Sequence, residues 1–238
     1  MKILILMLLF IVPSDVYAFA KTPEVPSDMP KWRVGYAMSH LYPAKVTQAY
    51  GVNEQGDWTS FLHNDQQYLF RTELSRMHRY LPDYDGYGIV LGTPVGYSGQ
   101  VMGTQILPDS VYIYWSSISN QRFFLTKFDL GDSLKKEMVE KRIFTTWDGV
   151  ELDCYNKDII FGFLPNGNTK LWLRGCGEYK YITELKPEAE LTADTFGNDA
   201  DIYKANYGKK MAARAKEVGA VLDPIPWDRV DKVYSDID

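Results

Sequence analysis

The sequence predicts an α+β protein made predominantly of antiparallel β-sheet in a sandwich-like arrangement, with a few appended helices. Aromatic residues are abundant, with 6 Trp, 17 Tyr and 11 Phe in 238 residues, and aromatic side chains pack well on the pleated face of a sheet. Short strand-like runs are separated by tight-turn sequences, and helical patterns are few. Strands joined by tight turns, with helices appended, are typical of an antiparallel α+β domain.

Composition and charge exclude several classes of protein. Hydrophobic residues make up 45% and charged residues 24% of the chain, close to the globular average, which excludes a disordered chain. The 26 basic and 31 acidic side chains give a formal net charge of −5. Because a mildly acidic protein has no overall positive field, we expect no nucleic-acid partner.

Residues 1–18 have the pattern of a secretory signal peptide. Lys2 precedes an unbroken apolar run, Ile3 to Val12, and the run is followed by a small-residue site that predicts cleavage after Ala18. Ten apolar residues span about 15 Å as a helix, against a hydrocarbon core of about 30 Å, so no stable membrane insertion is expected. No cysteine lies at the cleavage site, so the chain lacks the lipid-attachment residue of a lipoprotein and we expect a soluble exported protein. A buried N-terminal strand or helix is the alternative.

The mature chain is expected to begin with an extended leader, residues 19–31, which is rich in Pro and polar residues. The remainder, residues 32–238, is expected to form a single β-rich globular domain. Its first two strands are predicted at residues 32–38 and 44–52, with a break at Tyr42-Pro43. Residues 64–80 are ambiguous, but apolar residues at helical spacing favour a helix there.

The central part of the chain contains the clearest hairpin. A turn cluster at residues 81–88 precedes a short strand at 89–91 and a Gly/Pro-rich surface loop at 92–103. Two β-rich runs, residues 111–116 and 122–128, flank a short polar turn and predict the hairpin. A short amphipathic helix is expected at 132–142.

The last third of the chain contains the strongest turn signal. Asn166-Gly167 lies between predicted strands at 158–164 and 169–173, and both central residues of a type I′ turn need positive φ. Another strand is predicted at 179–185. Residues 200–218 have the composition of a helix, and Gly219 occupies the position of a C-cap.

The two cysteines, Cys154 and Cys176, both lie in the exported part of the chain. An oxidising compartment lets such thiols pair, so we favour a structural disulfide between them. Two buried free thiols are the alternative. A zinc site needs about four ligands, and no histidine is near either cysteine in the sequence, so no metal is expected.

Motifs for catalysis are weak. Gly96-Tyr97-Ser98-Gly99-Gln100 fails as a nucleophile elbow at its last position, and each of His40, His63 and His78 is expected to be an ordinary surface or core residue. Asp83-Tyr84-Asp85-Gly86 is too short for a calcium loop, because position 94 is Pro rather than the closing Glu. Trp115 and Trp172 are expected in the core. Four carboxylates could form a catalytic pair, but sequence gives no distances between them. They are Asp148, Glu151, Asp153 and Glu178.

Several stretches together resemble an uncharacterised family of Gram-negative envelope proteins, many of them lipoproteins by their sequences. Each stretch is a weak pattern, but their order and spacing cover most of the mature chain. They are Trp32-Arg33-Val34-Gly35 with Tyr42-Pro43, then Leu107-Pro108-Asp109 with Val111 to Ser117, then Phe161 to Gly167 and Leu171 to Gly177.

Some members of that family are encoded beside phospholipase effectors of the type VI secretion system and are taken to be immunity proteins. The resemblance therefore implies a periplasmic inhibitor that binds a cognate lipase effector and is a monomer before binding. It implies no catalytic residue and no cofactor. The tyrosine- and acid-rich turn is the expected contact loop, since acidic side chains steer toward a basic patch on a partner. Its contact residues are Asp83, Tyr84, Asp85 and Tyr87.

Two other functions are compatible with the sequence. One is a periplasmic carbohydrate- or envelope-binding module that uses exposed aromatic side chains. The other is a hydrolase built on a pair of carboxylates, which would require two of them to converge in a pocket.

Overall fold

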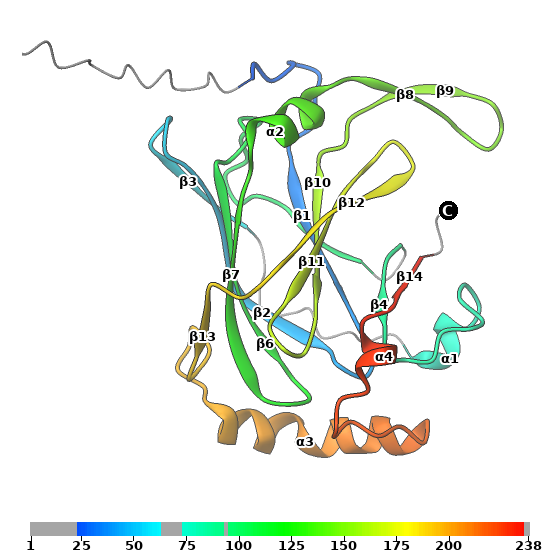
Figure 1. Cartoon of the computed structure of the whole chain (residues 1–238). Coiled ribbons are helices and arrows are strands. Elements are labelled where there is room, and N and C mark those ends of the chain that lie inside the picture. Colours follow the sequence, from blue (N-terminus) through cyan, green and yellow to red (C-terminus); the bar gives the residue numbers. More distant parts are fainter. Residues whose placement is uncertain (1–22, 63–72, 93–94, 236–238) are drawn as a thin grey trace, which may run out of the picture.

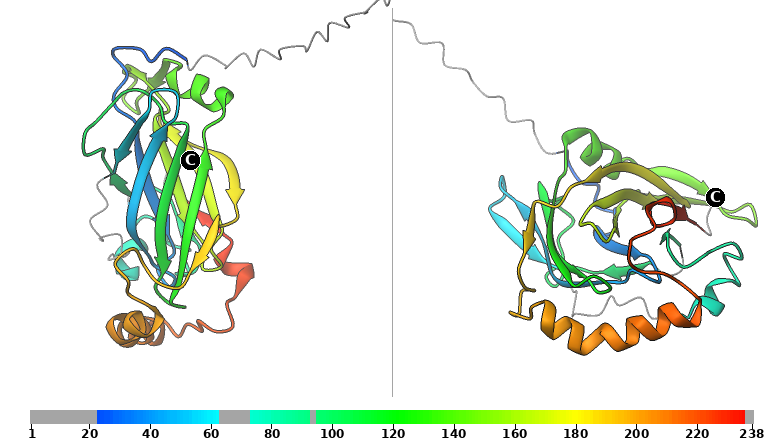
Figure 2. Two further views of the ribbon diagram at one scale, coloured as in Figure 1. Left: turned by 90° about the vertical axis from the view of Figure 1, so that its left-hand side faces the viewer. Right: turned by 60° about the horizontal axis from the view of Figure 1, so that its bottom comes forward.

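The computed structural model describes residues 23–62, 73–92 and 95–235. Two β-sheets pack face to face as a sandwich, and a long helix lies across one end of it (Figure 1). Figure 2 shows the strands of both sheets running along the long axis of the sandwich. The predicted α+β class, with mainly antiparallel strands and few helices, is confirmed.

The larger sheet has seven strands within the described residues and contains both antiparallel and parallel strand pairs. In spatial order they are β12 (Glu178–Leu185), β11 (Thr169–Gly175), β10 (Asp158–Phe163), β1 (Arg33–Met38), β4 (Ile89–Val90) and β14 (Val233–Tyr234), and β5 (Gly96–Ser98) also pairs with β1. Most neighbours are antiparallel, but β1 pairs with β10 in parallel, and so does β4 with β14. A parallel pair needs a long connection, and here two strands far apart in the chain lie at the centre of the sheet.

The smaller sheet has five strands, all antiparallel to their neighbours. In spatial order they are β13 (Ala189–Leu191), β7 (Arg122–Asp129), β6 (Ser110–Ser117), β2 (Ala44–Asn53) and β3 (Trp58–Phe61). The predicted hairpin is β6 and β7, which pair from Ser110↔Asp129 to Ser117↔Arg122. A separate two-stranded sheet joins β8 (Arg142–Thr145) to β9 (Glu151–Cys154).

The core lies between the two sheets and is rich in aromatic rings. Trp115 stacks on Phe163 across the sandwich, with ring centroids 4.4 Å apart, and Phe124 lies 4.8 Å from Trp115. The indole of Trp115 donates to Thr126 Oγ1 at 3.0 Å, so its buried N–H is satisfied. Trp172 is also buried, which confirms the expectation that both tryptophans are core residues.

The described part of the predicted leader, residues 23–31, contains neither helix nor strand. It is nevertheless part of the folded domain, because Met29 is completely buried. Asp28 accepts a hydrogen bond from the hydroxyl of Tyr155 at 2.7 Å. The domain therefore begins before Trp32, earlier than the sequence suggests.

Four helices are present in the described part of the chain: α1 (Leu74–Met77), α2 (Asp132–Val139), α3 (Ala200–Glu217) and α4 (Trp227–Val230). Helix α3 starts where the Asp199 carboxylate accepts from Ile202 N at 3.0 Å, and it ends before Gly219, whose φ is +63°. Tyr203 anchors α3 by packing edge-on against Phe123. Of the helix predicted at 64–80, residues 64–72 lie outside the described residues and the rest contains only α1.

The surface loop predicted at residues 92–103 is partly wrong. Within it, β5 adds to the edge of β1, and Ser98 is completely buried. Strands β3, β8, β9, β13 and β14 were also not assigned from the sequence, because each has four residues or fewer, too short for a clear period.

Candidate functional site

One hairpin, which we call the projecting hairpin, spans residues 142–154 and exposes several apolar side chains. Its two strands, β8 and β9, pair only with each other among the described strands. In Figure 1 it extends away from the sandwich at the end opposite to α3. A two-stranded hairpin alone is marginally stable in water, so its base must be held by other contacts.

A disulfide holds the base of the projecting hairpin. Cys154, the last residue of β9, is bonded to Cys176, which lies in the turn between β11 and β12, with Cα atoms 5.3 Å apart. The predicted disulfide is confirmed. Beside it, the ring of Phe144 lies so close to Gly177 that a Cβ atom there would be 2.3 Å from the ring.

Ion pairs surround the same base. Arg142 lies within 3.5 Å of carboxylate oxygens of Glu137, Glu140 and Glu178. The ammonium group of Lys141 donates to Asp28 and Asp153, and these hydrogen bonds raise the pKa of Lys141. Such exposed pairs each contribute little to stability, but together they restrict the direction in which the hairpin extends.

The tip of the hairpin is a hydrogen-bonded turn from Thr146 to Val150. Thr146 N donates to Val150 O and Gly149 N donates to Thr146 O, both at 2.9 Å. Val150 N donates back to Thr146 Oγ1 at 3.0 Å, and Gly149 has a φ of +82°, which favours glycine. The turn therefore has a defined shape, although it extends into solvent.

The projecting hairpin exposes apolar and acidic side chains together. Trp147, at the tip, is 99% exposed, and three aliphatic side chains on the strands and turn are about half exposed or more. They are Ile143 at 66%, Val150 at 49% and Leu152 at 50%. From Thr146 to Asp153 the sequence contains three acidic residues, Asp148, Glu151 and Asp153, and no basic residue. Tryptophan is among the residue types enriched at binding hot spots.

The carboxylates considered for catalysis lie on or beside this hairpin rather than in a pocket. Asp148 accepts from Thr146 Oγ1, Asp153 pairs with Lys141, and Glu178 pairs with Arg142. Glu151 and Asp153 lie on the same strand, two positions apart, and are both exposed. This arrangement offers solvated charge to a partner and no enclosed site for a substrate.

The structure places the two tyrosines of the predicted contact loop inside the molecule. Tyr84 is 1% exposed, and its hydroxyl accepts from His40 N and donates to Gly88 O, both at 2.9 Å. Burial raises the pKa of Tyr84. The ring of Tyr84 therefore holds the turn to the core and does not face a partner, which corrects the expected role of this side chain.

Tyr87 is also buried, at 2% exposure, and its hydroxyl accepts from Val221 N at 3.0 Å. The guanidinium of Arg229 lies 3.8 Å from the centre of the Tyr87 ring and pairs with Asp85 at 2.9 Å. These contacts fix the turn to the C-terminal segment. Asp83 is exposed, and partner binding through Asp83 and Asp85 stays a prediction.

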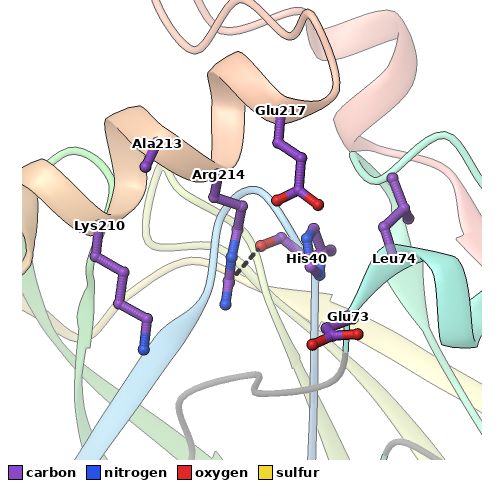
Figure 3. A pocket seen from close by; sticks show the side chains of 7 residues that line it. All are labelled: His40, Glu73, Leu74, Lys210, Ala213, Arg214 and Glu217. Carbon is purple, nitrogen blue, oxygen red and sulfur yellow. Dashed lines mark hydrogen bonds between the residues drawn. The ribbon is translucent and has the colours of Figure 1, made fainter.

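A cavity of about 420 Å³ lies between α3 and the start of α1 (Figure 3). Arg214 Nη1 donates to the carbonyl oxygen of His40 at 2.9 Å, and burial lowers the pKa of Arg214. Figure 3 shows carboxylates entering the cavity from Glu217 on α3 and from Glu73 at the start of α1. The full lining is His40, Glu73, Leu74, Lys210, Ala213, Arg214 and Glu217.

A second aromatic cluster lies on the outer face of the smaller sheet. Tyr50 stacks on Tyr112 with ring centroids 5.1 Å apart and planes 17° apart, and Tyr114 lies at 6.4 Å. Burial raises the pKa of Tyr50 to about 12. All three tyrosines are half-buried, whereas a sugar packs on an open ring face. The cluster therefore gives little support to a carbohydrate-binding platform.

Sequence reasoning did not single out Trp147. A signal was present, because Asp148-Gly149 is a strong hairpin-turn dipeptide and the strands on either side contain β-forming residues. Exposure of a tryptophan, however, depends on what else packs beside it, and that is visible only in the fold.

A family model described as "Protein of unknown function (DUF2931)" matches residues 20–228. No curated protein and no solved structure matches the chain. The matched region includes the smaller sheet, the larger sheet apart from β14, the projecting hairpin and helix α3.

Proposed function

The chain belongs to the DUF2931 family, and we propose that this member is a periplasmic immunity protein that binds and blocks a phospholipase effector of the type VI secretion system. The resemblance of the sequence to envelope proteins encoded beside such effectors suggests the partner. The protein acts by binding alone, one molecule to one lipase, and needs no cofactor. The signal-like N-terminus, expected to be cleaved after Ala18, would deliver it to the periplasm.

The projecting hairpin is the observation that carries this proposal. A fully exposed Trp147 on a turn of defined shape is unfavourable in a protein that has no partner, because its apolar surface remains in water. Burial of such a side chain at the centre of an interface contributes about 2 kcal/mol or more to binding. The disulfide at the base of the hairpin also supports a periplasmic location, since disulfides persist in the oxidising compartments to which proteins are exported.

A rigid scaffold suits an inhibitor of this kind. The hairpin is attached to a β-sandwich whose core is packed with aromatic rings. Its base is held by a disulfide and by ion pairs. Little conformational freedom is lost when such a surface binds, so more of the contact energy appears as affinity.

The direct test is co-expression with the lipase encoded beside this gene, followed by purification through a tag on the lipase. We expect the two proteins to elute together in a 1:1 complex and the lipase to lose its toxicity in the periplasm. Failure to co-purify, with toxicity unchanged when this protein is present, would contradict the proposal. The exposed Phe196 offers a matched control, since Phe196→Ala should leave the complex intact while Trp147→Ala weakens it.

A carboxylate-dependent hydrolase is the second candidate, and one observation favours it. The cavity beside α3 receives Glu73 and Glu217 from two different elements, and a pair of carboxyl groups can act as acid and base. Turnover of a glycoside substrate by the purified protein, abolished in Glu217→Gln, would support this candidate. Equal traces of turnover in the wild type and in the variant would exclude it.

A further inference from the structure

We infer that the projecting hairpin acts as a phospholipid mimic, which fills the entrance of the lipase substrate cleft with Trp147 and contacts its rim with the acidic residues behind it. This inference rests on the proposed function and specifies which part of the lipase is blocked. It concerns the hairpin alone, and the rest of the molecule serves to hold it.

The apolar half of the mimic is the tip. Trp147 is 99% exposed, and Val150 in the same turn is 49% exposed. A phospholipase must hold acyl chains in an apolar cleft that opens to solvent, because binding sites for apolar ligands are concave and lined with apolar side chains. A single projecting indole has the shape to enter such an opening, whereas a flat surface does not.

The acidic half lies directly behind the tip. Asp148 follows Trp147 in the turn, and Glu151 and Asp153 follow on β9, all of them exposed. A phospholipid likewise carries a negative phosphate next to its acyl chains. A lipase that binds this phosphate needs Arg, Lys or other donors at the rim of its cleft, and the same groups bind carboxylates. The order of apolar and anionic groups is therefore the same in the hairpin and in the substrate.

The hairpin is preorganised: its conformation is fixed before it binds. Cys154–Cys176 ties β9 to the turn between β11 and β12, and Phe144 packs against Gly177 beside the disulfide. Backbone and side-chain hydrogen bonds within residues 146–150 order the turn. A substrate molecule loses far more conformational freedom on binding, so a preformed mimic competes well with it.

A lipid surface is a poorer occupant for the same hairpin. Segments that bind the anionic face of a membrane carry clusters of Lys and Arg, and each basic residue favours binding. The segment from Thr146 to Asp153 carries three acidic residues and no basic one, so an anionic surface would repel it. Charge therefore favours a protein whose cleft has a basic rim.

The test measures binding of the full-length mature protein to the purified lipase with and without a soluble, non-hydrolysable short-chain phospholipid. At about ten times the dissociation constant of this analogue, we expect the apparent affinity to fall about tenfold. We expect Trp147→Ala to weaken binding about 30-fold and Asp148→Asn with Glu151→Gln to weaken it about tenfold, with less dependence on salt. The controls are Phe196→Ala and the double variant Glu54→Gln with Glu188→Gln, which should bind as the wild type does.

The outcomes separate the mimic from the proposed function. If a complex forms but neither the analogue nor Trp147→Ala changes its affinity, the hairpin is not in the substrate cleft, and inhibition by docking elsewhere still stands. If no complex forms, the proposed function itself fails. Trp147-dependent binding to vesicles of phosphatidylglycerol, or Trp147-dependent dimerisation in sedimentation, would overturn the mimic in favour of a membrane or a second copy of the chain.

Discussion

Arg33 and Asp158 begin the two strands that pair in parallel within the larger sheet, and they face each other in the register of β1 and β10. Arg33 Nε and Nη2 donate to the two carboxylate oxygens at 2.7 and 2.8 Å, and the Asp158 side chain is 4% exposed. Burial alone would raise the pKa of Asp158, but the hydrogen bonds of Arg33 and the charge of Lys157 outweigh it and hold this pKa below its usual value. A bidentate salt bridge of this kind specifies the register of β1 against β10, because a shift of either strand would break it.

Asp158→Asn should therefore destabilise the protein in a pH-dependent way. The pKa of Asp158 is lower in the folded state than in the unfolded chain, where it is about 3.9, so the unfolded state binds more protons. The contribution of the charge is complete above about pH 5 and is lost as the pH falls through the folded-state pKa. We expect the variant to lose about 2 kcal/mol of unfolding free energy at pH 7, measured by urea unfolding.

The difference between Asp158→Asn and the wild type should shrink as the pH is lowered below about 4. Asp83→Asn is the control, because Asp83 is exposed and its loss should change stability by less than about 0.5 kcal/mol at any pH. A constant difference between the Asp158 variant and the wild type from pH 7 to pH 3 would contradict the assignment.

At the scale of elements, the projecting hairpin depends on a glycine at its base. Gly177 has a φ of +79°, and a Cβ atom added there would lie 2.3 Å from the ring of Phe144. Gly149 at the tip has a similar φ of +82° but has no atom within 4 Å of an added Cβ. The two glycines therefore separate the cost of backbone strain from the cost of displacing Phe144.

Gly177→Ala should cost more stability than Gly149→Ala. The left-handed backbone costs each variant about 1 kcal/mol, and displacement of Phe144 adds about 1–3 kcal/mol to the first only. Urea unfolding of both variants measures the difference. Equal losses in the two variants would show that Phe144 does not hold the hairpin to the turn between β11 and β12.

The disulfide should contribute to stability through the same base. A loop closed by cysteines 22 positions apart is worth about 3 kcal/mol in the chain-entropy model, so Cys154→Ser with Cys176→Ser should lose about that amount of unfolding free energy. Adding reductant should destabilise the wild type and leave the variant unchanged. Two reactive thiols in the unreduced, denatured wild-type protein would contradict the pairing.

Elements with strong local signals were predictable, and the contacts between distant segments were not. Asn166-Gly167 predicted a hairpin, and β10 and β11 form it. The expected type I′ turn is wrong, however, because Gly167 has a positive φ, +99°, but Asn166 does not, and Gly167 N donates to Leu164 O. The parallel pairing of β1 with β10 has no local signal, because it depends on which edges meet after the chain collapses. The candidate site was predictable only in part for the same reason. The sequence identified the two cysteines as a disulfide pair. The burial of Tyr84 and the exposure of Trp147 could not be predicted, because they depend on contacts between distant segments.

At the scale of the whole molecule, the two ends of the sandwich differ. Helix α3 lies across one end, and the projecting hairpin extends from the other, with the core closed between them (Figures 1 and 2). No helix in residues 23–62, 73–92 and 95–235 is long and apolar enough to cross a membrane. The hairpin extends from the end of the sandwich opposite to α3, and we assign binding to that end.

Titration of the purified lipase with the purified mature protein, read out as hydrolysis of phospholipid, tests the central claim most directly. If the protein inhibits by docking, activity should fall linearly and reach zero at one molecule of inhibitor per molecule of lipase, and Trp147→Ala should require a large excess. Full lipase activity at a tenfold excess of the wild-type protein would contradict the account.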